Sequence, residues 1–258
     1  MSASIVISGA SRGLGAALAT ALAAPGITLH LLARDAAALA AVAAACRARG
    51  ATTHVAALDV TDAAAMTTQL LAWDAAAPLT LVVANAGTSA GTRPDGAPEG
   101  HAQALRQVRV NLEGAMNLVE PLLPALLARG TGQLLLVSSV LAFRGLPDAP
   151  AYAASKAGLW AYGEALRAAH APAGLRVTLA APGFFTSAMS ARVQGGPRLG
   201  SVSAATMAAR LLRAVRRGRG RVVSPWWLGA LLRGLALLPA GMGDWLARRL
   251  RYRVEPGG

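Results

Sequence analysis

Residues 4–15 read SIVISGASRGLG, an apolar run that passes directly into a turn rich in glycine. The run 4–8 is typical of a buried strand, and the glycines at positions 9, 13 and 15 let the backbone bend tightly and approach a ligand. A helix that follows such a turn directs its free N–H groups and the positive end of its dipole at that ligand. Although glycines also close ordinary strand-to-helix turns, this order predicts a cradle for the pyrophosphate of a nucleotide.

Beyond this unit, short runs rich in β-formers alternate with longer runs rich in alanine and leucine, as in βαβ units that build a parallel sheet. Runs such as 79–84 are apolar throughout, which indicates helices on both faces of the sheet. We therefore expect an α/β, single-domain Rossmann fold with a doubly wound parallel sheet of about seven strands. The expected strands lie near residues 4–8, 27–33, 52–57, 79–84, 133–138, 175–181 and 220–224, and the expected helices near 14–24, 35–49, 62–76, 101–128, 151–170 and 202–216.

The chain has 258 residues, a length that α/β folds often reach as one unit. We expect residues 1–224 to form the catalytic domain, and residues 225–258 to form a helical extension rather than a separate domain. The two longest expected loops, 87–100 and 183–201, follow strand ends, where ligands of open α/β sheets bind.

Composition excludes several classes of protein. A hydrophobic fraction of 54% with only 14% charged residues excludes a disordered chain. A single cysteine, Cys46, excludes an internal disulfide and a multi-cysteine metal site, and it fits a reducing compartment. Because the chain opens on a predicted strand and not on a secretory signal, we expect a cytoplasmic protein. We also expect no metal site.

The net charge of +13 is concentrated at one end of the chain. Residues 1–191 are nearly balanced, with 12 basic and 10 acidic side chains, whereas residues 192–258 hold 13 arginines against Asp244 and Glu255. The basic residues form no recognition motif for nucleic acid, so we expect no such partner. The charge is therefore a property of the C-terminal region.

Tyr152 and Lys156 are spaced to lie on one face of the same helix. A nearby ammonium stabilises a phenolate, so we expect Lys156 to lower the pKa of Tyr152 towards the working pH of a general acid or base. Such pairs are usually surface pairs, but Lys156 is the only lysine among 25 lysines and arginines. Ser139, at the end of an expected strand, lies within reach of the helix terminus that bears the tyrosine.

These residues, taken in order, resemble the short-chain dehydrogenase/reductase family over residues 3–224. The matching positions are residues 8–15, Asp59 in Leu58-Asp59-Val60, Asn85-Ala86-Gly87, Asn111, Ser139, Tyr152, Lys156 and Pro182-Gly183. Two departures are mild: Ala84 stands where the family often has asparagine, and Ser187 where it often has threonine.

The resemblance implies a role for each catalytic position. It implies that Tyr152 is the general acid or base and that Lys156 lowers its pKa and holds the nicotinamide ribose. It implies that Ser139 binds the substrate oxygen and that Asn111 holds a water that relays protons to the lysine. Our catalytic prediction is therefore Asn111, Ser139, Tyr152 and Lys156.

The resemblance also implies a cofactor site: Asp59 meets the adenine, Asn85 supports the central strands, Pro182 and Gly183 border the nicotinamide, and Ser187 keeps a hydroxyl for the carboxamide. Asp59 has a purely structural alternative as a helix cap, in competition with Thr61 or Asp62. The expected cofactor-binding residues are Gly9, Ser11, Arg12, Gly13, Leu14, Gly15, Arg34, Asp59, Val60, Asn85, Ala86, Gly87, Tyr152, Lys156, Pro182, Gly183 and Ser187.

Cofactor choice depends on the end of the second strand, where an acidic side chain would bind the ribose of NAD. That position is Ala33, followed by Arg34, and Arg12 lies in the glycine turn. Two guanidinium groups are suited to the 2′-phosphate of NADP. Asp35 argues for NAD, but we interpret it as the cap of the next helix. We therefore predict NADP(H) rather than NAD(H).

The predicted substrate is apolar, because the loops that line the pocket in similar enzymes carry apolar side chains and only Arg144 among charged ones. Simple packing of these loops is the alternative. The expected substrate-binding residues are Ser139, Leu141, Phe143, Tyr152, Phe184, Phe185 and Met189, with Leu146 and Pro147 nearby.

Residues 225–242 are almost wholly apolar but are interrupted by Arg233 and Pro239, which argues against a helix that spans a membrane. One interpretation, which we favour, is that this extension covers the pocket or a partner subunit. The other is that residues 225–253, with three tryptophans and several arginines, lie on an anionic membrane surface.

We therefore expect an NADPH-dependent oxidoreductase that reduces an apolar ketone or aldehyde to an alcohol, or runs the reverse reaction, and that forms a homodimer or homotetramer as similar enzymes do. The alternatives are a non-catalytic NADP(H)-sensing protein on the same fold and an NAD-preferring alcohol dehydrogenase.

Overall fold

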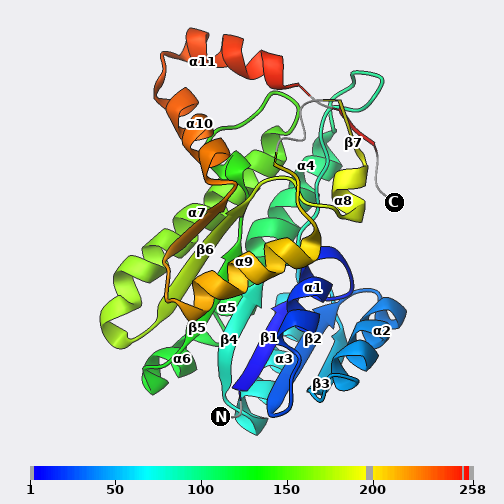
Figure 1. Ribbon diagram of the computed structural model, residues 1–258, viewed down its shortest axis with the longest axis vertical. Helices are drawn as coiled ribbons and strands as arrows, with labels where there is room; N and C mark the ends of the chain where they lie inside the picture. Colours follow the sequence, from blue (N-terminus) through cyan, green and yellow to red (C-terminus); the bar gives the residue numbers. More distant parts are fainter. Residues whose placement is uncertain (1–2, 196–199, 252, 256–258) are drawn as a thin grey trace.

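Successive residues of the central strands point to opposite faces of one sheet, and both faces are apolar. In the computed structural model, which describes residues 3–195, 200–251 and 253–255, seven parallel strands pair in the order β3-β2-β1-β4-β5-β6-β8 (Figure 1). The strands are β1 (Ala3–Ser8), β2 (Ile27–Ala33), β3 (Thr52–Ala57), β4 (Leu79–Ala84), β5 (Gln133–Val137), β6 (Arg176–Pro182) and β8 (Arg221–Ser224). The order changes direction between β1 and β4, where ligands of doubly wound sheets bind. This confirms the predicted Rossmann fold.

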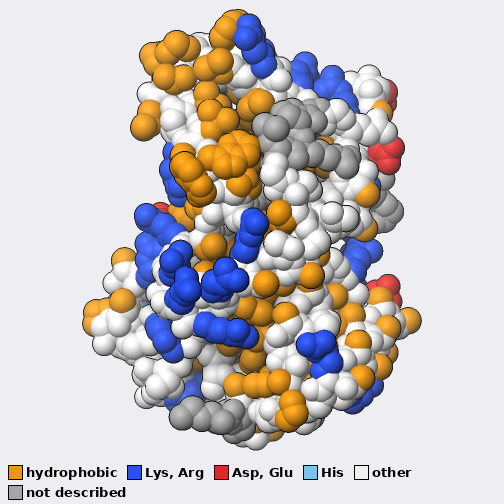
Figure 2. Space-filling model, in the orientation of Figure 1, with side chains coloured by type: hydrophobic (Ala, Val, Ile, Leu, Met, Phe, Trp, Pro, Cys, Tyr) orange, Lys and Arg blue, Asp and Glu red, His pale blue; other side chains and the backbone are white. Residues whose placement is uncertain are grey.

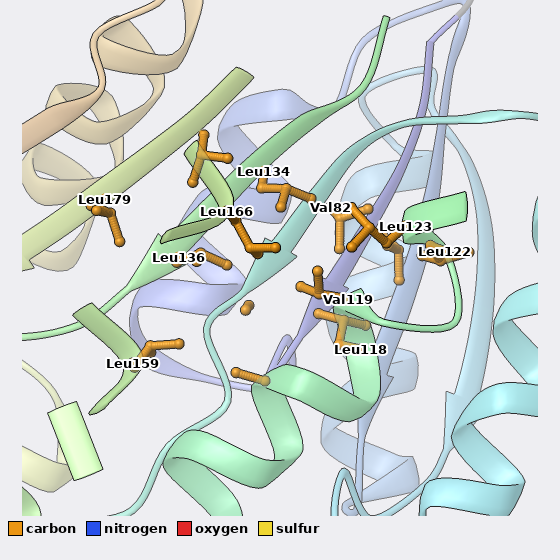
Figure 3. Packing of buried hydrophobic residues seen from close by; sticks show 14 of the residues in the cluster. Val82, Leu118, Val119, Leu122, Leu123, Leu134, Leu136, Leu159, Leu166 and Leu179 are labelled. Carbon is orange, nitrogen blue, oxygen red and sulfur yellow. The ribbon is translucent and has the colours of Figure 1, made fainter. Parts of the chain in front are cut away.

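Helices cover both faces of the sheet. On one face, Ile5 and Ile7 of β1 pack in a core with α1 (Gly13–Leu22), α2 (Ala36–Arg47) and α9 (Ala204–Arg216). On the other face, Val6 packs with α3 (Ala63–Ala76), α5 (Gly114–Val119) and α7 (Pro150–His170). Figure 3 shows this second core, in which Leu134 and Leu136 of β5 meet Leu166 of α7. The apolar strand runs are thus explained by burial on both sides.

The helix expected over residues 101–128 is wrong as one element. The structure divides it into α4 (His101–Val108), a π-helical turn (Arg109–Glu113), α5 and α6 (Leu123–Arg129). Pro121 separates α5 from α6 because proline has no N–H to donate and blocks the preceding turn. The π turn is a widened turn, a feature often found at functional sites, and it contains Asn111.

The C-terminal extension consists of α10 (Trp226–Leu237), α11 (Ala240–Ala247) and a short strand β9 (Arg253–Val254). β9 pairs antiparallel with β7 (Val193–Gln194), which follows the short helix α8 (Ala188–Ala191) inside the region expected to be a loop. Figure 1 shows α10 and α11 above the carboxyl edge of the sheet. Within the described residues, none of the helices has the length and apolar character needed to cross a bilayer.

Candidate active site

The glycine turn between β1 and α1 has the shape expected of a phosphate cradle. Gly9 and Gly13 have φ values of +66° and +57°, which favour glycine. A Cβ on Gly15 would lie 2.1 Å from the Gly9 carbonyl oxygen, so the turn has no room for a side chain there. Among the described residues, the side chain of Arg12 makes no capping bond at the start of α1, and the first N–H groups of the helix are left for a ligand. The turn therefore fits a dinucleotide pyrophosphate.

Segment 85–87 holds this turn in place. Asn85 Nδ2 donates to the carbonyl oxygens of Ser8 and Gly9 at 3.0 and 3.2 Å. Ser8 Oγ accepts the backbone N–H groups of Asn85 and Ala86, both at 3.1 Å. The resemblance implies that Asn85 supports the central strands, and the structure places its amide directly against the glycine turn. The role of the Ser8 hydroxyl was missed, although its position at the end of β1 was a signal.

The four expected catalytic residues come together at the carboxyl edge of the sheet. Ser139 follows β5 and begins a 3₁₀ turn, with its Oγ accepting the N–H of Leu141 at 3.2 Å. Tyr152 lies in the first turn of α7, and its phenol is near enough to the Ser139 side chain for the serine to lower the pKa of the phenol. Lys156 lies one turn later, buried, with Nζ 6.0 Å from the centre of the tyrosine ring. Ser139, Tyr152 and Lys156 are thus neighbours.

Asn111 is fully buried and joins this group from the π turn. Its Nδ2 donates to Ser155 Oγ at 2.9 Å and to Thr88 O at 3.0 Å, while its Oδ1 accepts the N–H of Thr88 at 2.7 Å. A Cβ on Gly87 would lie 3.2 Å from Asn111 Oδ1 and 3.5 Å from Lys156 Nζ. The asparagine, the lysine and the cofactor-side segment therefore meet at Gly87.

Two serines beside the expected residues were missed. Ser138 Oγ donates to the carbonyl oxygen of Lys156 at 2.7 Å, and Ser155 Oγ donates to the carbonyl oxygen of Tyr152 at 2.8 Å. Both hydroxyls fix the turn of α7 that carries the tyrosine and the lysine. The adjacent pair Ser138-Ser139 at a strand end was the available signal.

The expectation that Lys156 lowers the pKa of Tyr152 is wrong in this structure. Burial raises the pKa of Tyr152 above its ordinary value, and the nearby Ser139 side chain offsets only part of that rise. Lys156 Nζ donates to the carbonyl oxygen of Val137 at 2.9 Å and does not reach the phenol. Burial also lowers the pKa of Lys156 to about 8. At neutral pH Tyr152 is therefore a protonated phenol, ready to donate.

The expected adenosine end of the cofactor site is a cavity of about 410 Å³ lined by Arg34 and Asp59, together with His101, Arg106 and Arg109 of the α4 region. Asp59 accepts the N–H and the hydroxyl of Thr61, and its Oδ2 lies 3.7 Å from Arg34 Nη1. The cap of α3 is Asp62, whose side chain accepts the N–H of Ala65, and not Asp59. Val60 is buried against Gly114.

Asp35 caps α2 by accepting the N–H of Ala38 at 3.0 Å, as predicted. Arg34 is left exposed, with 58% of its side chain accessible. Arg106 and Arg109 were missed because nothing in their local sequence separates them from solvated helix residues.

The expected nicotinamide end lies beyond β6. Pro182 ends the strand, and the N–H of Gly183 donates to Ser224 O at 2.8 Å. Ser187 caps α8, and its Cβ lies 3.7 Å from where a Cβ on Gly13 would be. Ser187 is therefore next to the glycine turn, where a cofactor passing over it would meet the hydroxyl. Ser11, partly buried, and Leu14, buried, complete the turn.

On the substrate side, Tyr152 lies in a small apolar cluster with Leu141, Leu146 and Phe184. Val193 of β7 and Val254 of β9 belong to the same cluster and were missed. Phe143 instead packs edge-on against Trp160, with a ring separation of 4.8 Å, and Phe185 packs in the opposite core. Neighbouring residues of an extended segment point in opposite directions, so Phe184 and Phe185 pack in different clusters.

A larger cavity of about 790 Å³ lies between loop 141–147, the side of α7 formed by Ala153, Ala154 and Ala157, and the extension. Tyr152, Ser139, Phe184, Phe185 and Met189 do not line it, so we do not identify it with the reacting centre. It is also more charged than the loop sequence suggested, because α11 and the residues after it contribute Asp244, Arg248 and Arg251. No cluster of three or more histidine, cysteine or acidic residues suited to a metal occurs in the described part of the chain.

Comparison with known proteins agrees with this geometry. The family described as short chain dehydrogenase matches residues 3–197. An uncharacterised oxidoreductase of Mycobacterium tuberculosis is 37% identical over 241 residues, covering 91% of this chain and 93% of that protein.

Solved structures of similar fold include a short-chain dehydrogenase from Sphingobium yanoikuyae in complex with NADPH, with 24% identity, a TM-score of 0.79 and 96% of each chain covered. A short-chain dehydrogenase/reductase from Burkholderia phymatum in complex with NAD has 23% identity and a TM-score of 0.78, covering 90% of this chain and 92% of that one. At these identities the two structures establish the fold.

Proposed function

The chain belongs to the short-chain dehydrogenase family of oxidoreductases, and from that premise we propose that it reduces an apolar ketone or aldehyde to an alcohol with NADPH, or runs the reverse reaction. One observation carries the proposal. A Cβ on Gly9 would lie 2.8 Å from Ala86, and a Cβ on Gly87 would lie 3.2 Å from Asn111 Oδ1 and 3.5 Å from Lys156 Nζ, so segment 85–87 lies between the phosphate cradle and the helix that carries Tyr152 and Lys156. A dinucleotide laid on the cradle would end beside Tyr152.

The side chains divide the work of carbonyl reduction. When bound, the nicotinamide ring supplies the hydride that the carbonyl carbon accepts. Tyr152 donates its proton to the carbonyl oxygen, and Ser139 holds that oxygen through its hydroxyl. Lys156 holds the nicotinamide ribose, and Asn111 positions the water that returns a proton towards the lysine. The raised pKa of Tyr152 suits this direction, since the phenol enters the reaction protonated.

The proposed preference for NADPH rests on the charge around the adenosine cavity. Arg34 is exposed at the end of β2, Asp35 is engaged as a helix cap, and Arg106 and Arg109 line the same cavity. Guanidinium groups bind a phosphate with charge-assisted hydrogen bonds. Among the residues that line this cavity the one carboxylate is Asp59, which Arg34 and Thr61 already engage. We expect Arg34→Ala to lower the ratio of kcat/KM for NADPH over NADH by roughly tenfold. An unchanged ratio would contradict the preference.

The proposed substrate is apolar because Tyr152 belongs to an apolar cluster that includes Leu141, Leu146, Phe184, Val193 and Val254. A screen of apolar ketones, aldehydes and secondary alcohols, followed by absorbance of the reduced nicotinamide, tests the activity. Tyr152→Phe should lower kcat by roughly 100- to 10,000-fold while NADPH still binds. Parent protein that binds NADPH without turning over any such compound would favour a sensing protein instead.

A further inference from the structure

The outer face of the extension is apolar and uncovered. Six of the ten large hydrophobic side chains that are exposed in the described part of the chain lie on α10 and α11, including Trp226 at 75%, Leu237 at 86% and Trp245 at 52% accessibility. We call this set the outer face; its members are Trp226, Trp227, Leu231, Leu237, Met242 and Trp245. Figure 2 shows hydrophobic side chains gathered over α10 and α11. Contiguous exposed apolar surface of this kind marks a binding site.

The inner face of the same helices is already buried. Gly229, Leu232 and Leu235 of α10 face the body of the protein, and a Cβ on Gly229 would lie 2.4 Å from Val223. Arg233, the only charged residue of α10, stacks on Phe143 at 3.6 Å. Arg233 itself remains exposed, but the outer-face residues of α10 are all uncharged. A helix that is apolar on several sides is normally buried on all of them, whereas this chain buries only the inner side of α10.

The charges around the outer face are positive. Arg248 and Arg249 are exposed directly after α11, and Arg249 stacks on Trp245 at 3.9 Å. Asp244, the one acidic residue of α11, pairs with Arg144. Below the outer face, Figure 2 shows basic side chains gathered over α9, where Arg213 and Arg216 are exposed. An apolar face rich in tryptophan and bordered by arginines is complementary to anionic lipid headgroups over an acyl layer.

We propose that the outer face of α10 and α11 binds the surface of an anionic membrane, with both helices lying in the interface. A second copy of the chain is the competing cover, but a symmetric contact would bring Arg248 and Arg249 of each copy towards the same arginine-rich surface. Lipid phosphates and carboxylates would instead neutralise these charges. An apolar substrate partitions into the same layer, although the inference does not depend on the proposed reaction.

Sedimentation of the full chain with vesicles tests the proposal without substrate or cofactor, so its outcome is independent of the proposed activity. The protein should sediment with vesicles of phosphatidylcholine and phosphatidylserine in equal amounts, sediment less with phosphatidylcholine alone, and be released by high salt. Equal binding to both vesicles, or binding to neither, would overturn the proposal.

Two variant pairs locate the binding surface. Trp226→Ser with Leu237→Ser should lower the partition coefficient by roughly tenfold or more. Val55→Ser with Leu71→Ser removes two apolar side chains that are 48% and 46% exposed on β3 and α3, away from the extension, and should leave the partition coefficient unchanged. Arg248→Gln with Arg249→Gln should lower it roughly tenfold, and Arg47→Gln with Arg49→Gln, which removes the same charge elsewhere, should lower it less. Equal effects of test and control pairs would contradict the assignment to this face.

Light scattering without vesicles examines the competing cover. The mass of the protein should be the same for the parent and for Trp226→Ser with Leu237→Ser. A dimer that dissociates in this variant would assign the outer face to a second copy and overturn the membrane proposal.

Discussion

The glycine turn and the segment before α7 that contains Asp148, which we call the lip, are stabilised by different kinds of contact. At the turn, Asn85 and Ser8 join neighbouring strands of the sheet through hydrogen bonds between neutral groups. At the lip, buried Asp148 is held by Arg251 at 3.0 Å and Arg253 at 2.8 Å, about a hundred residues further along the chain. The first side depends on the regular sheet, and the second on a segment outside it.

The difference extends to the loops around Tyr152. The N–H of Thr92 donates to Asp148 O, the N–H of Val254 donates to Thr92 O, and Glu255 donates to Arg192 O, each at 2.9 Å. The C-terminal strand thus ties loop 87–100, the lip before α7 and the region of β7 together. This C-terminal segment, Arg251 with β9, lies outside the parallel sheet, and we call it the strap. We expect the two sides to respond differently to acid, substitution and salt.

The largest expected effect is the loss of stability in acid that comes from His30, on the strand beside β1. His30 of β2 is buried, with Nε2 bonded to Ser4 Oγ at 3.0 Å and its ring against Trp73, and burial, helped by His54, lowers its pKa to about 4. Because the folded-state pKa lies below the unfolded value of 6.5, the unfolded chain binds the proton more tightly. The free energy of unfolding keeps this contribution above pH 6.5. It loses up to about 3 kcal/mol as the pH falls from 6.5 through the folded-state pKa.

Denaturant unfolding between pH 7 and pH 4 measures this loss. His30→Gln, which keeps an amide for Ser4 but does not titrate, should flatten the acid limb, and His101→Gln at an exposed position serves as the control. An acid limb unchanged in His30→Gln would remove His30 as its cause.

A smaller effect is expected at the glycine turn. In Gly15→Ala the added Cβ would lie 2.1 Å from the Gly9 carbonyl oxygen and 2.6 Å from Asn85 Nδ2, so backbone must move. We expect a loss of about 1–3 kcal/mol in the free energy of unfolding, together with weaker NADPH binding. Gly241→Ala, on α11 with open space around it, is the matched control and should be stabilising by about 0.5–1 kcal/mol. Titration of cofactor fluorescence and thermal unfolding measure both; NADPH binding as tight as the parent's in Gly15→Ala would place the pyrophosphate elsewhere.

At the lip, Asp148→Asn should separate substrate binding from cofactor binding. The substitution keeps the size of the side chain but removes the charge that holds Arg251 and Arg253, so the lip before Tyr152 loosens. We expect kcat/KM for the substrate to fall roughly tenfold, because misplacement of a catalytic group is costly, and the Kd for NADPH to stay unchanged. Asp95→Asn, which removes an exposed loop carboxylate near Arg93, is the control. Equal loss of NADPH affinity would mean that the two sides are not independent.

The sequence predicted best what the sheet determines. Strand 79–84 was found because apolar residues fill both faces, and Asp35 was identified as a cap because it directly precedes a run of helix formers. The strap was not predicted, since a run of arginines near a C-terminus does not indicate which carboxylate each one meets. The positions of Phe143 and Phe185 in loops predicted contact with the substrate. In the structure Phe143 packs against Trp160, and Phe185 packs in the opposite core. The predicted direction of the Tyr152 pKa shift was wrong for a related reason. Helical spacing identifies Lys156 as a neighbour of Tyr152, but it does not show how deeply the tyrosine is buried.

The smallest expected effect distinguishes the two arginines of the strap. Both meet Asp148 Oδ1, but 51% of the Arg251 side chain is accessible against 31% for Arg253. Water and salt screen an exposed pair more, so Arg251→Gln should cost less stability than Arg253→Gln, which should cost about 1 kcal/mol. Since each arginine partly replaces the other as a partner for Asp148, the double variant should cost more than the sum of the two single ones. Unfolding midpoints at low and high salt measure all three, and high salt should shrink the Arg251 effect first. If both single variants lose equally at every salt concentration, exposure does not rank the contacts, and the lip is held by the hydrogen bonds of β9 and Thr92 instead.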